Sequence, residues 1–363
     1  MKFMDEYRDP QMALKLVERI HRRSPEGVRF MEFCGGHTFA IMKHGLRQLL
    51  SPKVQLISGP GCPVCVTSIS EIDKAIALAN QPDVILATFG DMLRVPGSRS
   101  SLQHTRAEGG DVRVIYSALD ALELARANPD KSVVLVGIGF ETTAPTVAAS
   151  LAEAKSSGID NYHVLSFHKL CPPVIKALLE SGEIKLDGII CPGHVSTIIG
   201  SRPYEFVARD HGIASVVTGF EPLDILLAVD MMLAQIEREE PKVEIAYHRG
   251  VAPDGNREAL KFMEKVFVVG EADWRGIGKL PGSGLRVGPD YRNFDAESSF
   301  SITLPPSKEP PGCICGDILR GVKTPLQCKL FGKTCMPDSP VGPCMVSSEG
   351  TCAAYFLYGE NHE

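Results

Sequence analysis

The sequence predicts an α/β protein with two related Rossmann-like parallel-sheet domains and a smaller cysteine-rich domain. Short, almost continuously apolar segments alternate with helical patterns, and this alternation runs through two series of similar length. Strands that are apolar on both sides belong to parallel sheets with helices on both faces. The third observation is that six of the eleven cysteines fall between Cys313 and Cys352, in a segment rich in Gly and Pro.

The expected elements follow from the apolar periodicity of the chain. A first helix is expected at 9–23, where Met12, Leu16, Val17 and Ile20 recur at helical spacing. The first series then predicts strands at 29–33, 54–58, 84–88 and 112–116, and helices at 40–49, 68–80 and 118–127. The second series predicts strands at 133–138, 163–167, 188–191 and 214–218, and helices at 145–155, 172–181 and 223–238.

The length of 363 residues is sufficient for two or three domains with separate cores. We expect one α/β domain over residues 1–128, a second over 129–248, and a loop-rich C-terminal domain over 249–363. The two series indicate a duplication, although no residue-level repeat accompanies it. Loops rich in Gly, Pro and Asp begin near residue 249, where the alternation of strands and helices ends.

The composition is that of a globular protein, with 44% apolar residues, 23% charged residues and a formal net charge of −6. Because the chain has no Lys/Arg run, nucleic acid is not an expected partner. The N-terminus lacks the apolar region of a signal peptide, and no window approaches the roughly 18 apolar residues of a membrane span. We therefore expect a cytoplasmic protein without membrane contact, whose cysteines stay reduced and available as ligands or redox groups.

Seven polar or sulfur-containing loops follow the expected strands. In open parallel sheets, ligands bind beyond the carboxyl ends of the strands, in loops that lead into helices. The loops of the first series contain CGGHT (34–38), GPGCPVC (59–65) and GDMLRVPGS (90–98). Those of the second series contain FETTAPT (140–146), HKLCPP (168–173), PGHVS (192–196) and GFEP (219–222). If the two sheets face each other, these loops form a single cleft.

Cys34 and His37 form a C-x-x-H pair separated by two glycines. This spacing lets a thiolate and an imidazole bind one metal ion, or lets the histidine lower the pKa of the thiol. A buried cysteine near a helix-capping histidine explains the motif equally well. The helix expected at 40–49 would place Cys34 near a helix N-terminus, where the macrodipole favours the thiolate.

Cys62 and Cys65 form a C-P-V-C motif before the helix expected at 68–80. The spacing matches a thioredoxin-type dithiol, in which a depressed thiol pKa supports cycling between thiol and disulfide. Half of a zinc site is the alternative, but no second C-x-x-C lies nearby to complete it. The Gly and Pro residues of the loop leave few side chains for packing, which disfavours a purely structural role.

The C-terminal block contains six cysteines, and four suffice for a [4Fe–4S] cluster. The preferred ligands are Cys315, Cys328, Cys335 and Cys352, with Cys313 and Cys344 as alternates. A zinc site is the rival interpretation. Zinc ligands usually form two tight pairs, however, and most of the spacings here are loose.

The motif GIGFET (137–142) follows an expected strand in the manner of a dinucleotide-binding turn. Thr142 replaces the third glycine and no acidic residue is placed for a ribose, so NAD is not expected. Glu141 and the adjacent threonines could bind an anion at a helix N-terminus. His168 and His194 lie in two of the cleft loops, although a lone histidine more often has a structural role.

Together the motifs resemble those of the HypD family, whose members mature nickel–iron hydrogenases. The resemblance rests on CGGHT, GPGCPVC, GFETTAPT (139–146), PGHVS, and the C-terminal segments CICGDILRGVKTPLQC and CMVSSEGTCAAYF, and it covers essentially the whole chain. Many members have CGGHTH, whereas this chain has Phe39, so no role of that second histidine is carried over. Cys34 and His37 are intact.

The resemblance implies two related α/β domains and a third domain that carries a [4Fe–4S] cluster. It also implies that the protein, together with a small HypC-type chaperone, holds an iron ion while cyanide and carbon monoxide are attached to give Fe(CN)2CO. A HypE-type protein would supply the cyanide as a thiocyanate. In this picture Cys34 and the N-terminal cysteine of the HypC-type partner ligate the iron, and Cys62 and Cys65 form a redox dithiol between cluster and iron.

The leading interpretation is therefore a redox-active assembly scaffold rather than a conventional turnover enzyme. In it, His37 either holds Cys34 as a thiolate or donates a proton. The alternative is an iron–sulfur disulfide reductase similar to ferredoxin:thioredoxin reductase, which needs the cluster and the dithiol but not Cys34. A third interpretation, a nucleotide-binding enzyme that uses GIGFET, requires saturable nucleotide binding.

Overall fold

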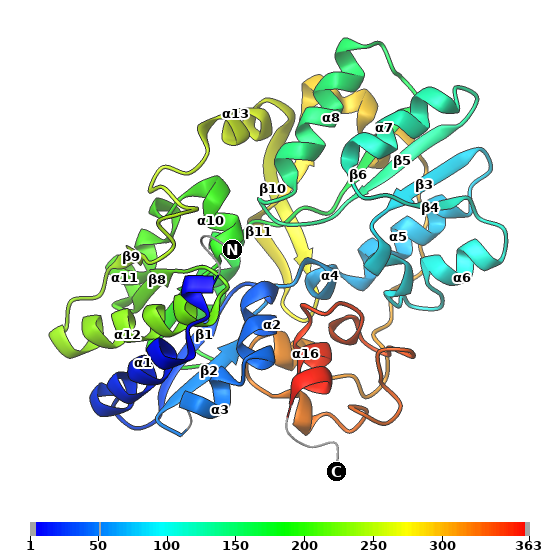
Figure 1. Cartoon of the computed structure of the whole chain (residues 1–363). Coiled ribbons are helices and arrows are strands. Elements are labelled where there is room, and N and C mark those ends of the chain that lie inside the picture. Colours follow the sequence, from blue (N-terminus) through cyan, green and yellow to red (C-terminus); the bar gives the residue numbers. More distant parts are fainter. Residues whose placement is uncertain (1–4, 51, 360–363) are drawn as a thin grey trace.

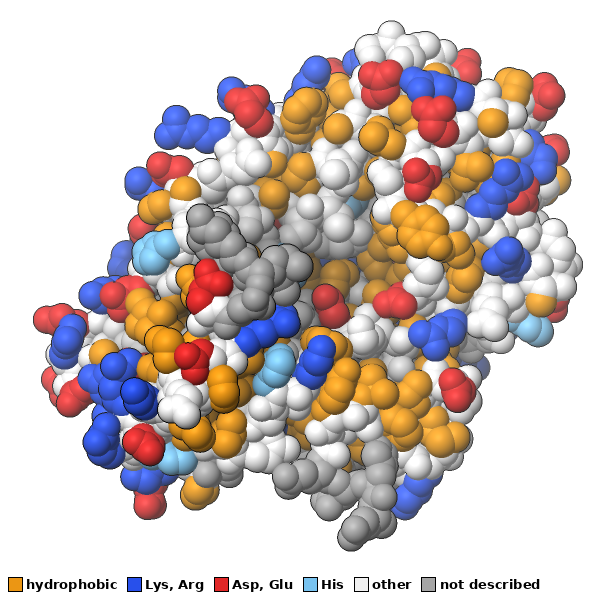
Figure 2. Space-filling model, viewed as in Figure 1, with side chains coloured by type: hydrophobic (Ala, Val, Ile, Leu, Met, Phe, Trp, Pro, Cys, Tyr) orange, Lys and Arg blue, Asp and Glu red, His pale blue; other side chains and the backbone are white. Residues whose placement is uncertain are grey.

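The computed structural model describes residues 5–50 and 52–359. Two parallel sheets lie on opposite sides of the molecule, an antiparallel hairpin lies between them, and the C-terminal segment packs against their junction (Figure 1). The surface is hollowed between the two halves in the same view (Figure 2). The predicted α/β class with parallel sheets and a separate cysteine-rich region is confirmed.

The first sheet has five parallel strands in the order β2-β1-β7-β8-β9. They are β1 (Val28–Glu32), β2 (Val54–Ser58), β7 (Gly188–Cys191), β8 (Ala214–Val217) and β9 (Val243–Ile245). The second sheet has four parallel strands in the order β4-β3-β5-β6. They are β3 (Val84–Thr88), β4 (Val112–Val114), β5 (Ser132–Gly137) and β6 (Tyr162–Ser166).

The strand pairings do not follow the expected boundary at residue 128. β1 and β2 pair in one sheet with β7 to β9, whereas β3 and β4 pair with β5 and β6. The chain therefore leaves the first sheet after β2, builds the whole second sheet, and returns at β7. Apolar periodicity identifies a strand but carries no information about its partner, because pairing is a contact between distant parts of the sequence.

The first sheet is flanked by helices whose apolar sides pack in one of two cores, both of which contain residues of its strands. They are α1 (Pro10–Arg23), α2 (Gly35–Lys43), α3 (Leu46–Leu50), α10 (Gly193–Ile199), α11 (Glu205–His211) and α12 (Pro222–Arg238). The single helix expected at 40–49 is instead split into α2 and α3. The break falls at Gly45, whose φ of 63° lies in the left-handed region that glycine adopts without strain.

The second sheet is flanked by α5 (Ile69–Ala79), α6 (Leu102–Ala107), α7 (Ala118–Ala127) and α8 (Ala144–Ser156). The remaining helices connect the sheets or belong to the C-terminal part: α4 (Pro63–Val66), α9 (Cys171–Ser181), α13 (Arg257–Val266), α14 (Ala296–Ser299), α15 (Cys315–Leu319) and α16 (Thr351–Tyr358). Short 3₁₀ turns are η1 (Asp5–Tyr7), η2 (Gly90–Arg94), η3 (Arg202–Tyr204), η4 (Pro289–Phe294), η5 (Pro325–Gln327) and η6 (Pro343–Met345).

The hairpin of β10 (Phe267–Trp274) and β11 (Gly278–Val287) precedes the cysteine-rich segment. That segment has little regular structure and ends in α16, which packs on α2 (Figure 1). The C-terminal helix therefore lies beside the loop that follows β1. Among the helices of the described segments, none has both the length and the apolar content needed to cross a bilayer.

Candidate functional site

Cys34 lies at the start of α2, two residues after β1 ends. It is the N-cap residue of that helix, with extended backbone angles, and 7% of its surface is exposed. The expectation that Cys34 lies near a helix N-terminus is confirmed. Burial and the nearby charges of Glu349 and Glu32 nevertheless raise the pKa of its thiol above the ordinary value, so desolvation outweighs the helix dipole here.

The carboxyl group of Glu32 holds the loop that contains Cys34 through two hydrogen bonds. Its Oε2 accepts a hydrogen bond of 3.0 Å from the backbone N–H of Cys34, and its Oε1 accepts one from the hydroxyl of Thr38. Burial raises the pKa of Glu32 to about 7. The sequence motifs did not identify Glu32. The signal available in the sequence was a single carboxylate at the end of an otherwise buried strand.

His194, rather than His37, is the histidine beside the Cys34 sulfur. Its Nδ1 lies 3.9 Å from Cys34 Sγ. His37 instead donates its Nε2 proton to the carbonyl of Gly219 at 3.0 Å, and burial lowers its pKa to about 4, which keeps the ring neutral. The ring of Phe220 stacks on both imidazoles, at centroid distances of 4.6 Å from His37 and 3.8 Å from His194. His194 of the PGHVS loop thus occupies the place beside the Cys34 sulfur that the C-x-x-H spacing predicted for His37.

Cys62 and Cys65 form a disulfide across the single turn of α4. Both side chains are buried. Cys65 Sγ lies 3.9 Å from the carbonyl oxygen of Pro343, which directly precedes Cys344 in the cysteine-rich segment. The predicted dithiol therefore lies next to the C-terminal cysteines.

The disulfide loop also touches the Cys34 loop through backbone atoms. A Cβ on Gly61 would lie 2.3 Å from the backbone nitrogen of Cys34, and the carbonyl of Gly61 accepts a 3.0 Å hydrogen bond from Gly35 N–H. Only glycine permits this approach, because any side chain would push the two loops apart. The motifs CGGHT and GPGCPVC, expected to share a cleft, are in direct contact.

All six C-terminal cysteines line one cavity, together with apolar side chains: Cys313, Cys315, Cys328, Cys335, Cys344 and Cys352. The structure thus brings together both the preferred ligands and the two alternates. Cys315 Sγ lies only 2.9 Å from Cys344 Sγ, and Cys335 Sγ accepts a 3.3 Å hydrogen bond from Val341 N–H. A soft sulfur donor set around one cavity fits an iron–sulfur cluster. In the described segments, no three Cys, His, Asp or Glu side chains meet in the arrangement of a single-ion site.

The tip of the β10–β11 hairpin joins the disulfide loop to the cysteine cavity. Arg275 N–H donates to the carbonyl of Val66 at 2.9 Å, one residue after Cys65, and Gly276 packs against the backbone of Gly316, next to Cys315. The Arg275 side chain is buried, and its Nη2 pairs with Glu309 at 2.9 Å. No motif marked Arg275 in the sequence.

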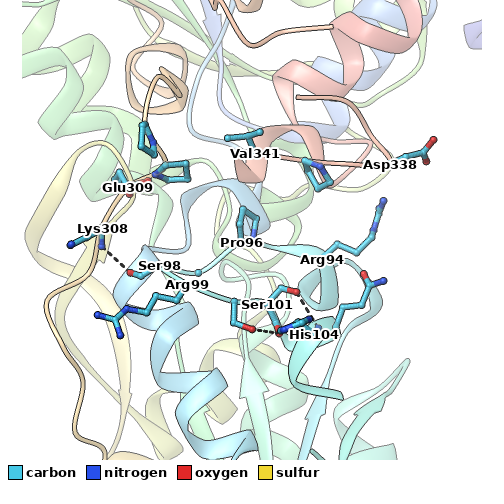
Figure 3. Close-up of a pocket in the computed structure, with 16 residues that line it drawn as sticks. Arg94, Pro96, Ser98, Arg99, Ser101, His104, Lys308, Glu309, Asp338 and Val341 are labelled. Atoms are coloured by element: carbon cyan, nitrogen blue, oxygen red, sulfur yellow. Dashed lines mark hydrogen bonds between the residues drawn. The ribbon is translucent and has the colours of Figure 1, made fainter. Parts of the chain in front are cut away.

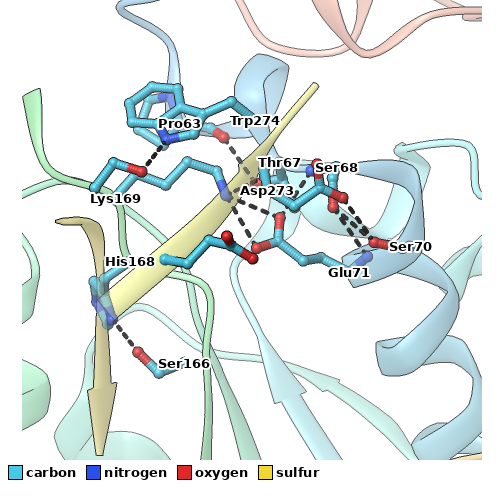
Figure 4. Close-up of polar contacts among 12 residues, drawn as sticks. Pro63, Thr67, Ser68, Ser70, Glu71, Ser166, His168, Lys169, Asp273 and Trp274 are labelled. Atoms are coloured by element: carbon cyan, nitrogen blue, oxygen red, sulfur yellow. Dashed lines mark hydrogen bonds and ion pairs between the residues drawn. The ribbon is translucent and has the colours of Figure 1, made fainter. Parts of the chain in front are cut away.

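A buried ion pair anchors the helix that follows the disulfide. Lys169 Nζ contacts both carboxylate oxygens of Glu71 at 3.0 Å and donates to the carbonyl of Asp273 at 2.7 Å (Figure 4). Glu71 also closes a capping box with Ser68 at the start of α5. The HKLCPP loop therefore contributes a structural lysine that ties α5 to the hairpin.

The two remaining sequence candidates have mainly structural contacts. His168 is buried, its Nδ1 faces Ser166 Oγ at 3.1 Å, and burial lowers its pKa to about 3. Glu141 accepts a 2.9 Å hydrogen bond from Cys171 N–H through Oε1, while its Oε2 is buried without a hydrogen-bond partner among the described residues. Burial raises the pKa of Glu141 to about 7.

Comparison with known proteins supports the motif-based resemblance. Residues 11–359 match the family model HypD, described as the hydrogenase formation hypA family. The chain is 48% identical to the hydrogenase maturation factor HypD of Rhizobium leguminosarum bv. viciae, over 100% of this chain and 97% of the relative. It is 44% identical to the hydrogenase maturation factor HypD of Escherichia coli (strain K12), over 99% and 98%. A third relative, the hydrogenase expression/formation protein HupD of Azotobacter chroococcum mcd 1, is 46% identical over 100% and 98%. The chain belongs to the HypD family.

Proposed function

We propose that the chain is a hydrogenase maturation factor that acts as a redox-active assembly scaffold. In this role it holds an iron ion, together with a small HypC-type chaperone, while cyanide and carbon monoxide are attached to form Fe(CN)2CO. Family membership supports the maturation role. The observation that carries the scaffold role is the backbone contact of Gly61 with Cys34, which puts a lone buried thiol beside a disulfide loop.

Cys34 is the proposed iron ligand on this chain, and the N-terminal cysteine of the HypC-type partner is the second. Because burial raises the pKa of the Cys34 thiol, binding of the iron must displace its proton. The Nδ1 atom of His194, 3.9 Å from the sulfur, can receive this proton. A soft thiolate suits the electron-rich iron that binds cyanide and carbon monoxide.

We place a [4Fe–4S] cluster in the six-cysteine cavity, where it supplies single electrons when bound. The sequence favoured Cys315, Cys328, Cys335 and Cys352 as ligands. Each iron of such a cluster takes its terminal thiolate at a separate corner, so two ligand sulfurs do not touch one another. Because the sulfurs of Cys315 and Cys344 lie 2.9 Å apart, these two residues do not both ligate the cluster in this arrangement, which supports keeping Cys315 as a ligand and Cys344 as an alternate.

The Cys62–Cys65 pair is the proposed two-electron carrier. Release of cyanide from a thiocyanate carried by a HypE-type partner breaks the S–CN bond and consumes two electrons, giving a thiolate and a cyanide ion. Oxidation of the two thiolates Cys62 and Cys65 to the disulfide supplies both electrons, so charge and atoms balance. A cluster held by the C-terminal cysteines would supply, one at a time, the two electrons that restore the dithiolate. The closeness of Cys65 to Pro343 supports a short route.

Infrared spectroscopy of protein purified without oxygen, in complex with its small chaperone, tests the proposal. We expect bands from metal-bound cyanide and carbon monoxide, and we expect Cys34→Ala to abolish them while the brown cluster remains. Cys191→Ala, which removes a buried thiol from β7, is the matched control and should keep the bands. Normal iron–cyanide loading in the Cys34→Ala complex would overturn the scaffold role.

A second candidate function, an iron–sulfur-dependent disulfide reductase, is favoured by the disulfide next to the cysteine cavity. It predicts that reduced protein cleaves a substrate disulfide and that Cys34→Ala leaves this rate unchanged. The scaffold function predicts instead that Cys34→Ala abolishes the activity, which is the loading of iron with cyanide. Both reactions require reduced thiols, so we propose a cytoplasmic location.

A further inference from the structure

A large open groove borders the cysteine cavity. It encloses about 740 Å³ between η2 with the loop that follows it, the start of α6, and two parts of the C-terminal segment. Figure 3 shows Arg94, Arg99 and Lys308 among the side chains around it. The iron and cyanide chemistry proposed above does not involve this groove.

The groove is cationic in a chain whose net charge is −6. Its charged lining consists of Arg94, Arg99 and Lys308 against Glu309 and Asp338, and His104 in the same lining pairs with Glu108. Glu309 is already neutralised by the buried Arg275. The side chains of Arg99 and Lys308 are exposed, and neither forms an ion pair with a residue that the structure describes. Their charges are therefore available to a ligand.

One wall of the groove is hydrogen-bonded to a cysteine that lines the cysteine cavity. Val341 lines the groove, and its N–H donates to Cys335 Sγ at 3.3 Å. The opposite rim includes Pro310 and Pro311, which lead directly to Cys313. Arg94 holds the intervening loop through the carbonyls of Pro337, at 3.0 Å, and Val346, at 2.9 Å. A partner seated in the groove would thus be separated from the cavity by a single layer of chain.

We propose that this groove is the docking site of a small acidic one-electron carrier protein, whose carboxylates pair with Arg99 and Lys308 and whose redox centre faces the Cys335 side of the cavity. The inference rests on the cluster proposed above. One electron leaves the reduced carrier and enters the cluster, so the carrier is oxidised by one unit and the cluster is reduced by one, without proton transfer. Complementary charge favours such an encounter and makes its rate depend on salt.

The test measures how fast a reduced acidic [2Fe–2S] ferredoxin, or a reduced acidic flavodoxin, reduces the cluster in stopped-flow experiments on the full chain. Arg99→Glu combined with Lys308→Glu should slow this step about tenfold or more at low salt and remove most of its salt dependence. Arg94 is left unchanged because it supports the loop. Reduction by dithionite should be unaffected in the variant, since that small reductant needs no docking.

The matched control is Lys15→Glu combined with Arg22→Glu, which makes the same charge change on the exposed side of α1. The control should keep the wild-type rate. The proposal is overturned if the groove variant keeps the wild-type rate, if the control slows equally, or if neither carrier reduces the wild-type protein. A chain without a dithionite-reducible cluster would refute the proposed function instead. In that case calorimetric binding of the oxidised ferredoxin to wild type and variant still decides whether the groove docks it.

Discussion

The sulfur atoms of Cys315 and Cys344 lie 2.9 Å apart, although the two residues are 29 positions apart in the chain. Cys315 begins α15 and Cys344 lies in η6, which packs on the disulfide turn α4. This pair therefore lines the cysteine cavity close to the Cys62–Cys65 disulfide. The sequence preferred Cys315 as a ligand and left Cys344 as an alternate, and the structure brings the two sulfurs into contact.

The first prediction concerns which cysteines hold the cluster. Cys328→Ser should lower bound iron and sulfide from about four of each per chain and weaken the brown absorbance, because it removes a proposed ligand. Cys344→Ser should retain both, since Cys344 is not among the proposed ligands. Iron and sulfide analysis of anaerobically purified variants gives the result. Full cluster content in Cys328→Ser together with loss in Cys344→Ser would reverse the assignment.

The second prediction concerns Gly61, the glycine at the contact between the GPGCPVC and CGGHT loops. Gly61→Ala places a Cβ 2.3 Å from the backbone nitrogen of Cys34, so backbone must move. We expect a loss of about 1–3 kcal/mol in unfolding free energy, as for other overpacked sites. Gly90→Ala is the control, because its Cβ would meet nothing closer than Val114 at 3.8 Å. Urea denaturation followed by circular dichroism compares the two, and equal stabilities would contradict the prediction.

The third prediction concerns the buried ion pair of Lys169 and Glu71, at the start of the helix that follows the disulfide. Lys169→Met leaves the carboxylate of Glu71 buried without its cation, which should cost about 3–5 kcal/mol. Adding Glu71→Gln should recover part of that loss, because the uncompensated charge is then removed. Lys176→Met, in an exposed pair with Glu180, should change stability by less than about 1 kcal/mol. Denaturant titration of wild type, the single variants Lys169→Met and Glu71→Gln, the double variant and Lys176→Met tests this, and additive single effects would exclude coupling.

The fourth prediction is a pH dependence that originates at Glu141. Burial raises its folded-state pKa to about 7, above the unfolded value, so the folded protein retains this proton where the unfolded chain has lost it. Its contribution to stability is complete below the unfolded pKa and is lost as the pH rises toward 7. The loss amounts to about 3 kcal/mol at most.

Glu141→Gln should therefore flatten the decline in stability between about pH 4.5 and pH 7 relative to wild type. Unfolding free energies measured at several pH values in that range give the comparison. Glu153→Gln, at a half-exposed position on α8, is the control and should follow the wild-type curve. Parallel curves for wild type and Glu141→Gln would show that this carboxyl group titrates normally.

The local apolar pattern of the sequence was sufficient to locate most helices and strands, but it did not indicate which strands pair with each other. The strands expected at 54–58, 84–88 and 188–191 and the helix expected at 118–127 have those bounds in the structure. The division at residue 128 failed as a guide to strand pairing, because β1 crosses over to pair with β7. A strand's own residues specify its burial on both faces, whereas its neighbour depends on how the whole chain is routed.

The sequence by itself determined the α/β class, the grouping of the cysteines, and the family to which the chain belongs. These depend on residue type and spacing, which are local. Only the tertiary structure decided that His194 approaches Cys34, that Glu32 lies beneath it, and that Arg275 joins the disulfide loop to the cavity. The Glu32 contact is local, whereas the other two join distant parts of the chain, and hydrogen bonding and burial fix those only after both sheets and the hairpin have packed.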